Sequence, residues 1–279
     1  MRVYIHIGVH KTASTLIQKS IQVNSRKIDG LHEIVRDRHP ELKNHLRKYL
    51  NGIVDKTHVT EKLNQILAAG EKINSLLISD ENLLGPPASV FIKRDQNKVF
   101  YPEAKHRILK LSEVFSDHEL TYLLYTREQE SLLPSLYLDG LKYFRYDLSM
   151  EEFIIKCLES NCRFDELLEA FDGQSLVFKK FEAIYRGGED FLADFWEAVG
   201  VKVQLKLPQD ERVNSAISSI EAEICRTIAQ LSLSHADKLI LRKWLRAMPE
   251  LSNKGSKVVP SPSILSQIRE EYQDDISYR

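Results

Sequence analysis

Short apolar runs alternate along the chain with longer segments whose apolar residues recur every three or four positions. The runs predict strands at about residues 2–7, 75–79, 119–126 and 175–179. The longer segments predict helices, among them 61–69, 103–115, 128–143, 150–159 and 263–272. Strands that alternate with helices indicate an α/β fold with a parallel sheet, which binds its ligands at the carboxyl ends of the strands.

The junction after the first predicted strand has the composition of a phosphate-binding loop. The strand ends at Gly8, and an apolar helical pattern starts at Leu16. Between them lie one lysine and three hydroxyl side chains: Lys11, Thr12, Ser14 and Thr15. Backbone N–H groups at a helix N-terminus, the helix dipole and a lysine together attract an anion. The alternative is a capped strand–helix junction with an exposed Lys11.

The loop does not have the Walker A spacing, because Gly8 precedes Lys11 by only three positions. It resembles the phosphosulfate-binding loop of sulfotransferases that use 3′-phosphoadenosine 5′-phosphosulfate (PAPS), in the form found in bacterial members acting on carbohydrates. The resemblance implies a P-loop-like, three-layer α/β/α fold with a central parallel sheet. It also implies that Lys11, Thr12, Ala13, Ser14 and Thr15 hold the 5′-phosphosulfate. Ala13 replaces a common glycine, and its extra methyl group should be tolerated if the backbone there is already helical.

A second part of the resemblance follows the predicted strand at 119–126. Arg127 comes at its end, and Ser135 follows after seven residues in a predicted helix. This pattern is similar to the site that holds the 3′-phosphate of PAPS in sulfotransferases, and a guanidinium can grip a phosphate through two hydrogen bonds. The alternative is a surface arginine paired with Glu128 or Glu130, together with a solvent-facing serine.

A third part lies between residues 175 and 215. A strand, a turn and a helix are followed by Arg212-Val213-Asn214-Ser215, an order that resembles bacterial sulfotransferases. In that family the region covers the nucleotide, which makes Arg212 and Asn214 candidates for binding the 3′-phosphate or the adenine. The alternative is that Asn214 or Ser215 caps the helix that follows.

A general base for the acceptor is expected after the strand at 75–79. The resemblance to the carbohydrate-specific branch implies that Glu81 takes the acceptor proton, with Asp80 in reserve. Either side chain could instead cap the following turn. His10, beside Lys11, could also be the base. Its position differs from that of the base histidine in the arylsulfotransferase branch. We therefore expect His10 to shape the loop or to contact the acceptor. His6 is expected to be a satisfied core histidine.

Composition limits the function classes. The chain has 279 residues and a formal net charge of −1, which argues against nonspecific nucleic-acid binding. Three cysteines, Cys157, Cys162 and Cys225, form neither a metal-ligand spacing nor a disulfide framework. We expect a single domain over residues 1–279, whose C-terminal helices from about residue 212 pack on the core. The sequence shows no signal segment and no run of transmembrane length, so we expect a cytoplasmic, bacterial protein.

The sequence therefore predicts a PAPS-dependent sulfotransferase that needs no metal. Lys11, Glu81 and His10 are its candidate catalytic residues, and its acceptor is a glycan or another small molecule. One alternative is a P-loop kinase or NTPase, for which Asp80 is the only plausible magnesium ligand at a strand end. The other is a noncatalytic nucleotide-binding or glycan-binding protein on a degenerate sulfotransferase scaffold. The acceptor and the oligomeric state are not indicated by the sequence.

Overall fold

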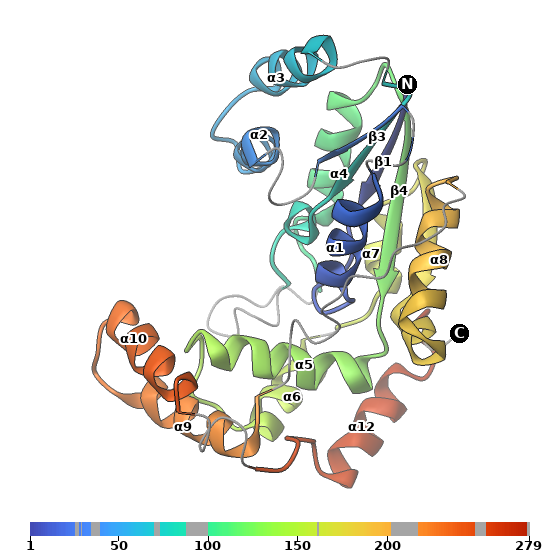
Figure 1. The fold of residues 1–279 in the computed structure, drawn as a ribbon. Helices are drawn as coiled ribbons and strands as arrows, with labels where there is room; N and C mark the ends of the chain where they lie inside the picture. Colours follow the sequence, from blue (N-terminus) through green and yellow to red (C-terminus); the bar gives the residue numbers. More distant parts are fainter. Residues whose placement is uncertain are drawn as a thin grey trace. The chain divides into compact units, whose positions relative to one another are not determined.

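The computed structural model describes residues 1–25, 28, 30–34, 40–69, 73–87, 100–160, 162–201, 217–248 and 255–277. The chain forms two compact units (Figure 1). We call Met1–Pro86, Tyr101–Arg127 and Phe164–Val213 the sheet unit. We call Pro87–Phe100, Glu128–Arg163 and Asn214–Arg279 the helical unit. The expectation that residues 1–279 form one domain, with C-terminal helices packed on the core, stays a prediction.

The sheet unit contains five parallel strands in the order β2-β3-β1-β4-β5. This confirms the predicted α/β fold and its parallel sheet. The four strands expected from apolar runs are present, and the short edge strand β2 was not predicted. The strands are β1 (Arg2–His6), β2 (Leu31–Ile34), β3 (Ser75–Ser79), β4 (Glu119–Thr126) and β5 (Ser175–Lys180).

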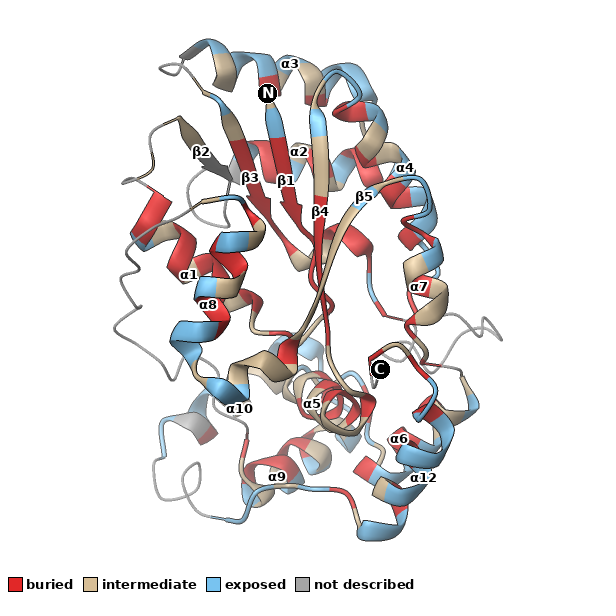
Figure 2. Ribbon diagram, turned by 90° about the vertical axis from the view of Figure 1, so that its right-hand side faces the viewer, coloured by how far each residue is buried: buried red, intermediate tan, exposed pale blue. Residues whose placement is uncertain are grey.

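Helices cover both faces of this sheet (Figure 2). On one face, α1 (Ser14–Asn24) packs against α8 (Gly188–Ala198), and both contribute to an apolar core with alternate residues of β1, β3 and β4. The other face carries α2 (Pro40–Leu50), α3 (Lys56–Ala69), α4 (Ala104–Val114) and α7 (Asp165–Glu169). The result is the expected α/β/α layering, and two short 3₁₀ helices, η2 (Glu81–Leu84) and η4 (Phe181–Arg186), follow β3 and β5.

The strand order fixes where a ligand can bind. In the order of the strands, β2 and β3 lie to one side of β1, and β4 and β5 lie to the other. The chain therefore reverses its direction across the sheet when it passes from β3 to β4. The carboxyl ends of β3, β1 and β4 therefore lie next to one another, with His6 paired with both Ser79 and Leu123. Such a reversal in strand order is where open α/β sheets bind ligands.

The helical unit consists of α5 (Gln129–Lys142), α6 (Met150–Glu159), α9 (Ser219–Gln230), α10 (His235–Arg246) and α12 (Pro262–Tyr272). Helix α5 packs against α6, α9 and α12, and α9 also packs against α10. Helix α6 has the predicted bounds, starting from a capping box at Ser149. The three cysteines are buried in this unit and are not in disulfides. None of the helices in the described ranges combines the length and apolar composition needed to cross a bilayer.

Candidate functional site

The loop after β1 starts from a backbone that stays tied to the sheet. The N–H groups of Ile7 and Val9 donate to the carbonyl groups of Leu123 and Tyr125 on β4, at 3.0 and 3.1 Å. Gly8 lies between them, and a Cβ there would come within 3.0 Å of both His6 Nε2 and Thr12 Oγ1. A larger residue at position 8 would therefore clash with these two side chains. The hydrogen bonds of Ile7 and Val9 fix the position from which the loop leaves the sheet.

The start of α1 has the features of an anion-binding terminus. Its N-cap is Ala13, which offers no side-chain hydrogen bond, and the first turn contains no acidic residue. The first N–H groups of a helix have no partners within it. Lys11 and Ala13 have positive φ angles of 69° and 59°, and turns of this kind point successive N–H groups toward one concave face. The loop can therefore hold an anion with its backbone.

Ala13 does not have the helical backbone on which tolerance of its methyl group depends. Its φ of 59° and ψ of 25° lie in the left-handed region, where a Cβ costs roughly 1–2 kcal/mol. The sequence argument relied on the helix that follows, but the residue just before that helix turns the chain in the opposite sense. Glycine would adopt this conformation without cost. The alanine therefore leaves the loop under local strain.

The hydroxyl side chains of the loop do not all face the same way. Thr12 is fully buried, and its Oγ1 donates to the carbonyl of Val9 at 2.6 Å. It therefore closes the loop internally and can offer a ligand only its backbone N–H. Ser14 and Thr15 lie in the first turn of α1, where a hydroxyl can supplement the terminal N–H groups.

Arg127 follows β4 and contacts the loop directly. Its Nη1 donates to the Lys11 carbonyl at 2.9 Å, and its guanidinium carbon lies 4.4 Å from the centre of the Phe181 ring. Burial lowers the pKa of the guanidinium, an effect that Tyr185 and Glu182 partly oppose. Arginine still keeps its charge at any physiological pH. The structure thus holds a desolvated cation against the loop that carries Lys11.

His10 is held by Tyr101. The Tyr101 hydroxyl accepts from the backbone N–H of His10 at 3.1 Å and lies 3.1 Å from its Nδ1, and the two rings are stacked. The hydroxyl can accept from the backbone and either donate to Nδ1 or accept from it, and the tautomer decides which. With the ring proton on Nε2, His10 is a hydrogen-bond donor that suits an anion or acceptor. With the ring proton on Nδ1, Nε2 is a base.

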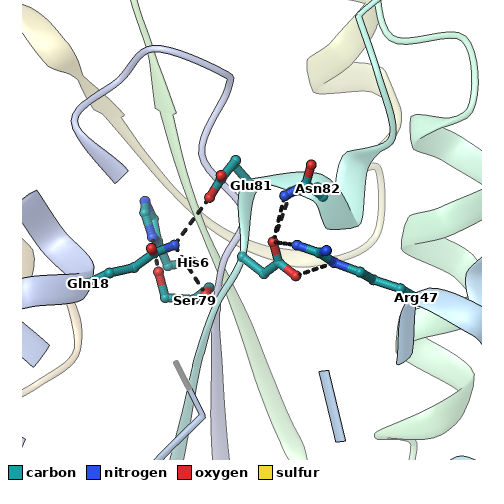
Figure 3. A network of polar contacts seen from close by, with 7 residues as sticks. His6, Gln18, Arg47, Ser79, Glu81 and Asn82 are labelled. Carbon is teal, nitrogen blue, oxygen red and sulfur yellow. Dashed lines mark hydrogen bonds and ion pairs between the residues drawn. The ribbon is translucent and has the colours of Figure 1, made fainter. Parts of the chain in front are cut away.

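Glu81 lies at the end of β3, beside the start of the loop, and a side chain of α1 orients it (Figure 3). Gln18 donates from Nε2 to Glu81 Oε2 at 3.1 Å and to the Ser79 carbonyl at 3.4 Å. Glu81 is half-buried, and Gln18 is buried. One carboxylate oxygen thus accepts from a neutral donor, which fixes the orientation of the carboxylate.

Asp80 has a different environment from Glu81 (Figure 3). Arg47 holds both of its oxygens, through Nε to Oδ2 at 2.8 Å and Nη2 to Oδ1 at 2.7 Å. Asn82 donates to Oδ1 from its backbone N–H and from its side chain. Burial alone would raise the pKa of Asp80, but the hydrogen bonds from Arg47 and Asn82 hold it below its usual value. Asp80 is a structural carboxylate and a poor base.

His6 lies under the loop and has no charge at neutral pH. Its Nδ1 is 2.7 Å from Ser79 Oγ, whereas its buried Nε2 has no hydrogen-bond partner among the described residues. Burial lowers its pKa to about 3, against a smaller opposing effect of Asp80. The prediction of a core histidine is correct for its burial, but only one of the two ring nitrogens is satisfied.

The remaining predicted site residues are not brought to the loop by the described structure. Ser135 lies in the second turn of α5, in the helical unit, whereas Arg127 belongs to the sheet unit. Arg212 and Asn214 lie outside the described residues. No cluster of three metal-ligating side chains occurs within the described ranges. The roles of Ser135, Arg212 and Asn214 stay predictions.

Four residues of the site were not assigned a role from the sequence: Gln18, Arg47, Tyr101 and Phe181. Each acts on a predicted residue that is distant along the chain; 91 positions separate Tyr101 from His10, and 63 separate Gln18 from Glu81. Gln18 had the clearest signal, since it is an amide one turn after the loop, between the apolar positions Ile17 and Ile21. A buried amide needs a polar partner.

Comparison with protein-family models gives no match, and comparison with curated proteins gives none at the significance required. Among solved structures, a sulfotransferase from Alicyclobacillus acidocaldarius resembles this chain with a TM-score of 0.44 and 11% sequence identity. The match covers 91% of this chain and 96% of that one. Function is therefore inferred from the residues of the site itself.

Proposed function

We propose that this protein is a sulfotransferase that moves a sulfuryl group from PAPS to a hydroxyl or amine of an acceptor, a carbohydrate or another small metabolite. The observation that carries the proposal is the hydrogen bond from Arg127 to the Lys11 carbonyl at 2.9 Å. It joins the two predicted halves of a nucleotide site, one for each phosphate end of the donor.

The residues of the sheet unit suit such a donor. The uncapped start of α1 and the left-handed turns at Lys11 and Ala13 favour an anion at the loop. In the proposal, the loop N–H groups, Lys11, Ser14 and Thr15 bind the 5′-phosphosulfate. Arg127 binds the 3′-phosphate, held in place by the Phe181 ring beside it. Ser135, Arg212 and Asn214 are proposed to complete the 3′-phosphate and adenine side.

Two side chains are proposed to carry the chemistry. The acceptor oxygen attacks sulfur while its proton passes to the Glu81 carboxylate, which Gln18 orients. The bond from sulfur to the bridging phosphate oxygen breaks, and its electron pair stays on that oxygen. The Lys11 ammonium stabilises the charge that develops there. Asp80 is engaged by Arg47 through both of its oxygens, which favours Glu81 over Asp80 as the base. Tyr101 holds the ring of His10, which stays the alternative base.

The kinase or NTPase alternative has weaker support. It needs a carboxylate at a strand end to hold magnesium, and the candidate was Asp80. Arg47 occupies both oxygens of that carboxylate with a bidentate ion pair. A magnesium ion would have to displace a guanidinium from a buried side chain. The degenerate-scaffold alternative predicts either no nucleotide binding, if the protein binds glycans alone, or nucleotide binding without transfer to any acceptor.

A calorimetric titration, followed by an acceptor screen with PAPS that detects transfer, separates the three functions. The wild-type protein is titrated with adenosine 3′,5′-bisphosphate without magnesium, and with ATP in the presence and absence of magnesium. Micromolar binding of the bisphosphate with weak ATP binding supports the sulfotransferase and justifies a screen of acceptors with PAPS. Tighter, magnesium-dependent ATP binding would favour the kinase. If neither nucleotide binds, the sulfotransferase proposal is wrong and the degenerate scaffold is favoured.

A further inference from the structure

Tyr101 holds His10 in one orientation within the sheet unit. It lies just before α4 and is 2% exposed. Its hydroxyl accepts from the backbone N–H of His10 at 3.1 Å and lies 3.1 Å from His10 Nδ1. The two rings also stack, with their centroids 6.1 Å apart and their planes at 22°. The contact at Nδ1 and the stack together fix the imidazole against rotation.

The same contacts favour one tautomer of His10. A phenol that accepts from a backbone N–H still carries its own proton. A buried hydroxyl is stabilised by donating that proton, and Nδ1 lies within reach at 3.1 Å. When Tyr101 donates to Nδ1, the ring proton is on Nε2. Because Nδ1 is turned to Tyr101, Nε2 is the nitrogen that can donate to a ligand.

His10 immediately precedes Lys11 in the loop to which the 5′-phosphosulfate is assigned above. In that assignment, the Lys11 ammonium acts on the bridging oxygen, where charge develops. The nonbridging oxygens of the sulfuryl group are anionic in the donor and stay so during transfer. Oxygens of this kind form their strongest hydrogen bonds with oriented N–H donors. An imidazole N–H fixed beside Lys11 is such a donor.

We propose that His10 donates from Nε2 to a nonbridging oxygen of the sulfuryl group of PAPS, and that Tyr101 is the positioning residue that sets the orientation and the tautomer of His10. This inference rests on the proposed function and deepens it. Because the oxygen is anionic before and during transfer, the contact strengthens binding of PAPS and changes kcat little. The product, adenosine 3′,5′-bisphosphate, lacks the sulfuryl group and is not held by His10.

The two nucleotides therefore test the role of His10 without an acceptor. Calorimetry measures the affinity of each variant for PAPS and for adenosine 3′,5′-bisphosphate, which differ only in the sulfuryl group. His10→Leu should weaken PAPS about tenfold and the bisphosphate less than about twofold, because one charge-assisted hydrogen bond is lost. His10→Gln keeps a side-chain N–H donor and should bind PAPS within about threefold of wild type.

Tyr101→Phe tests the positioning role, since it keeps the aromatic ring and removes only the hydroxyl. It should weaken PAPS about three- to fivefold more than it weakens the bisphosphate. The matched control is Tyr122→Phe, which removes a buried hydroxyl that donates to the Ile108 carbonyl at 3.1 Å. His106→Leu, at an exposed position of α4, controls for the loss of a histidine. Both controls should bind the two nucleotides as wild type does, and circular dichroism checks that each variant folds.

Steady-state kinetics with an acceptor found by screening add a second readout. In His10→Leu, KM for PAPS should rise while kcat stays within about twofold of wild type. A fall in kcat of about 10²-fold or more, equally large in His10→Leu and His10→Gln, would overturn the proposal, because His10 would then be the base.

The binding data can also contradict the proposal. Equal weakening of PAPS and the bisphosphate in His10→Leu and Tyr101→Phe would show that the pair only shapes the loop. Unchanged PAPS binding in His10→Leu would show that the imidazole does not reach the sulfuryl group. In both cases the wild type still binds the nucleotides, so the proposed function stands. If the wild type binds neither nucleotide, the proposed function and this role of His10 are both wrong.

Discussion

Arg127 donates a hydrogen bond from Nη1 to the carbonyl oxygen of Lys11 at 2.9 Å, across 116 positions of sequence. This contact joins the end of β4 to the loop after β1, so that a cation from one strand and a lysine from its neighbour belong to one site. The Phe181 ring packs on the guanidinium from the other side. Removing the Arg127 guanidinium should therefore weaken binding of the anion there, whereas the backbone of the loop stays tied to β4 through the N–H groups of Ile7 and Val9.

The strain at Ala13 leads to a prediction of stability. Ala13→Gly should raise the free energy of unfolding by about 1 kcal/mol, because the left-handed backbone no longer carries a Cβ. The matched control is Ala68→Gly, at the exposed second-last position of α3, where the same change should lower the free energy of unfolding by up to about 1 kcal/mol. Urea unfolding measures both. Equal losses in the two variants would show that the loop is not strained.

Burial of His6 predicts a pH dependence. Its pKa falls from 6.5 to about 3 in the folded protein, so below pH 6.5 the unfolded chain binds a proton that the native protein does not. The native state should therefore lose roughly 1.4 kcal/mol per pH unit between about pH 6 and pH 3 from this group. Above pH 7 the group contributes no pH dependence.

The variant His6→Gln isolates this effect. It should be less stable than wild type at pH 7.5, because a packed ring is lost, and the difference should shrink as the pH falls. The difference in free energy of unfolding between the two proteins, measured at several pH values by urea unfolding, cancels the other titrating groups. A difference that stays constant from pH 7.5 to pH 4.5 would mean that His6 takes up a proton in the native state.

Gln18 should affect turnover without affecting the nucleotide. Gln18→Leu removes the donor to Glu81, and we expect kcat to fall about five- to tenfold, the effect of one lost hydrogen bond. Glu81→Gln should lower kcat about 10²- to 10⁴-fold. Gln65→Leu, on the exposed part of α3, is the matched control. Steady-state kinetics with an acceptor found by screening measure these effects. An increase in KM for PAPS with unchanged kcat in Gln18→Leu would contradict the role given to Gln18.

The sheet could be predicted because its central strands are buried on both faces. Such strands appear in the sequence as continuous apolar runs, as at Leu120–Tyr125. The strand β2 has four residues at the sheet edge and gives no such run. Helix α2 was not predicted because charged residues dominate it, although Leu42, Leu46 and Leu50 repeat every four positions and are buried.

The site could be predicted only in part, for a physical reason. Lys11, Glu81 and Arg127 stand at strand ends, and a parallel sheet gathers strand ends at one edge. The partners of these residues depend on tertiary packing, so neither Gln18 beside Glu81 nor Arg47 on Asp80 follows from spacing. The sign of φ at Ala13 is equally invisible in a pattern of apolar residues. Spacing thus located the candidate site, whereas packing distinguishes its carboxylates.

The assignment of one phosphate to each cation is the central claim, and two nucleotides test it. Adenosine 3′,5′-bisphosphate carries both phosphates, and adenosine 5′-phosphate lacks the one assigned to Arg127. Arg127→Ala should weaken the bisphosphate about 10- to 100-fold and change the monophosphate less than about twofold, since one charge-assisted contact is lost. Lys11→Ala should weaken both nucleotides by similar factors.

Calorimetry of the wild type, the two variants and Arg2→Ala gives the decisive measurement. Arg2 lies at the exposed amino end of β1, away from the loop, and its removal should change neither affinity. The account predicts that only Arg127→Ala separates the two nucleotides. It is contradicted if Arg127→Ala weakens both nucleotides equally, or if the wild-type protein binds neither.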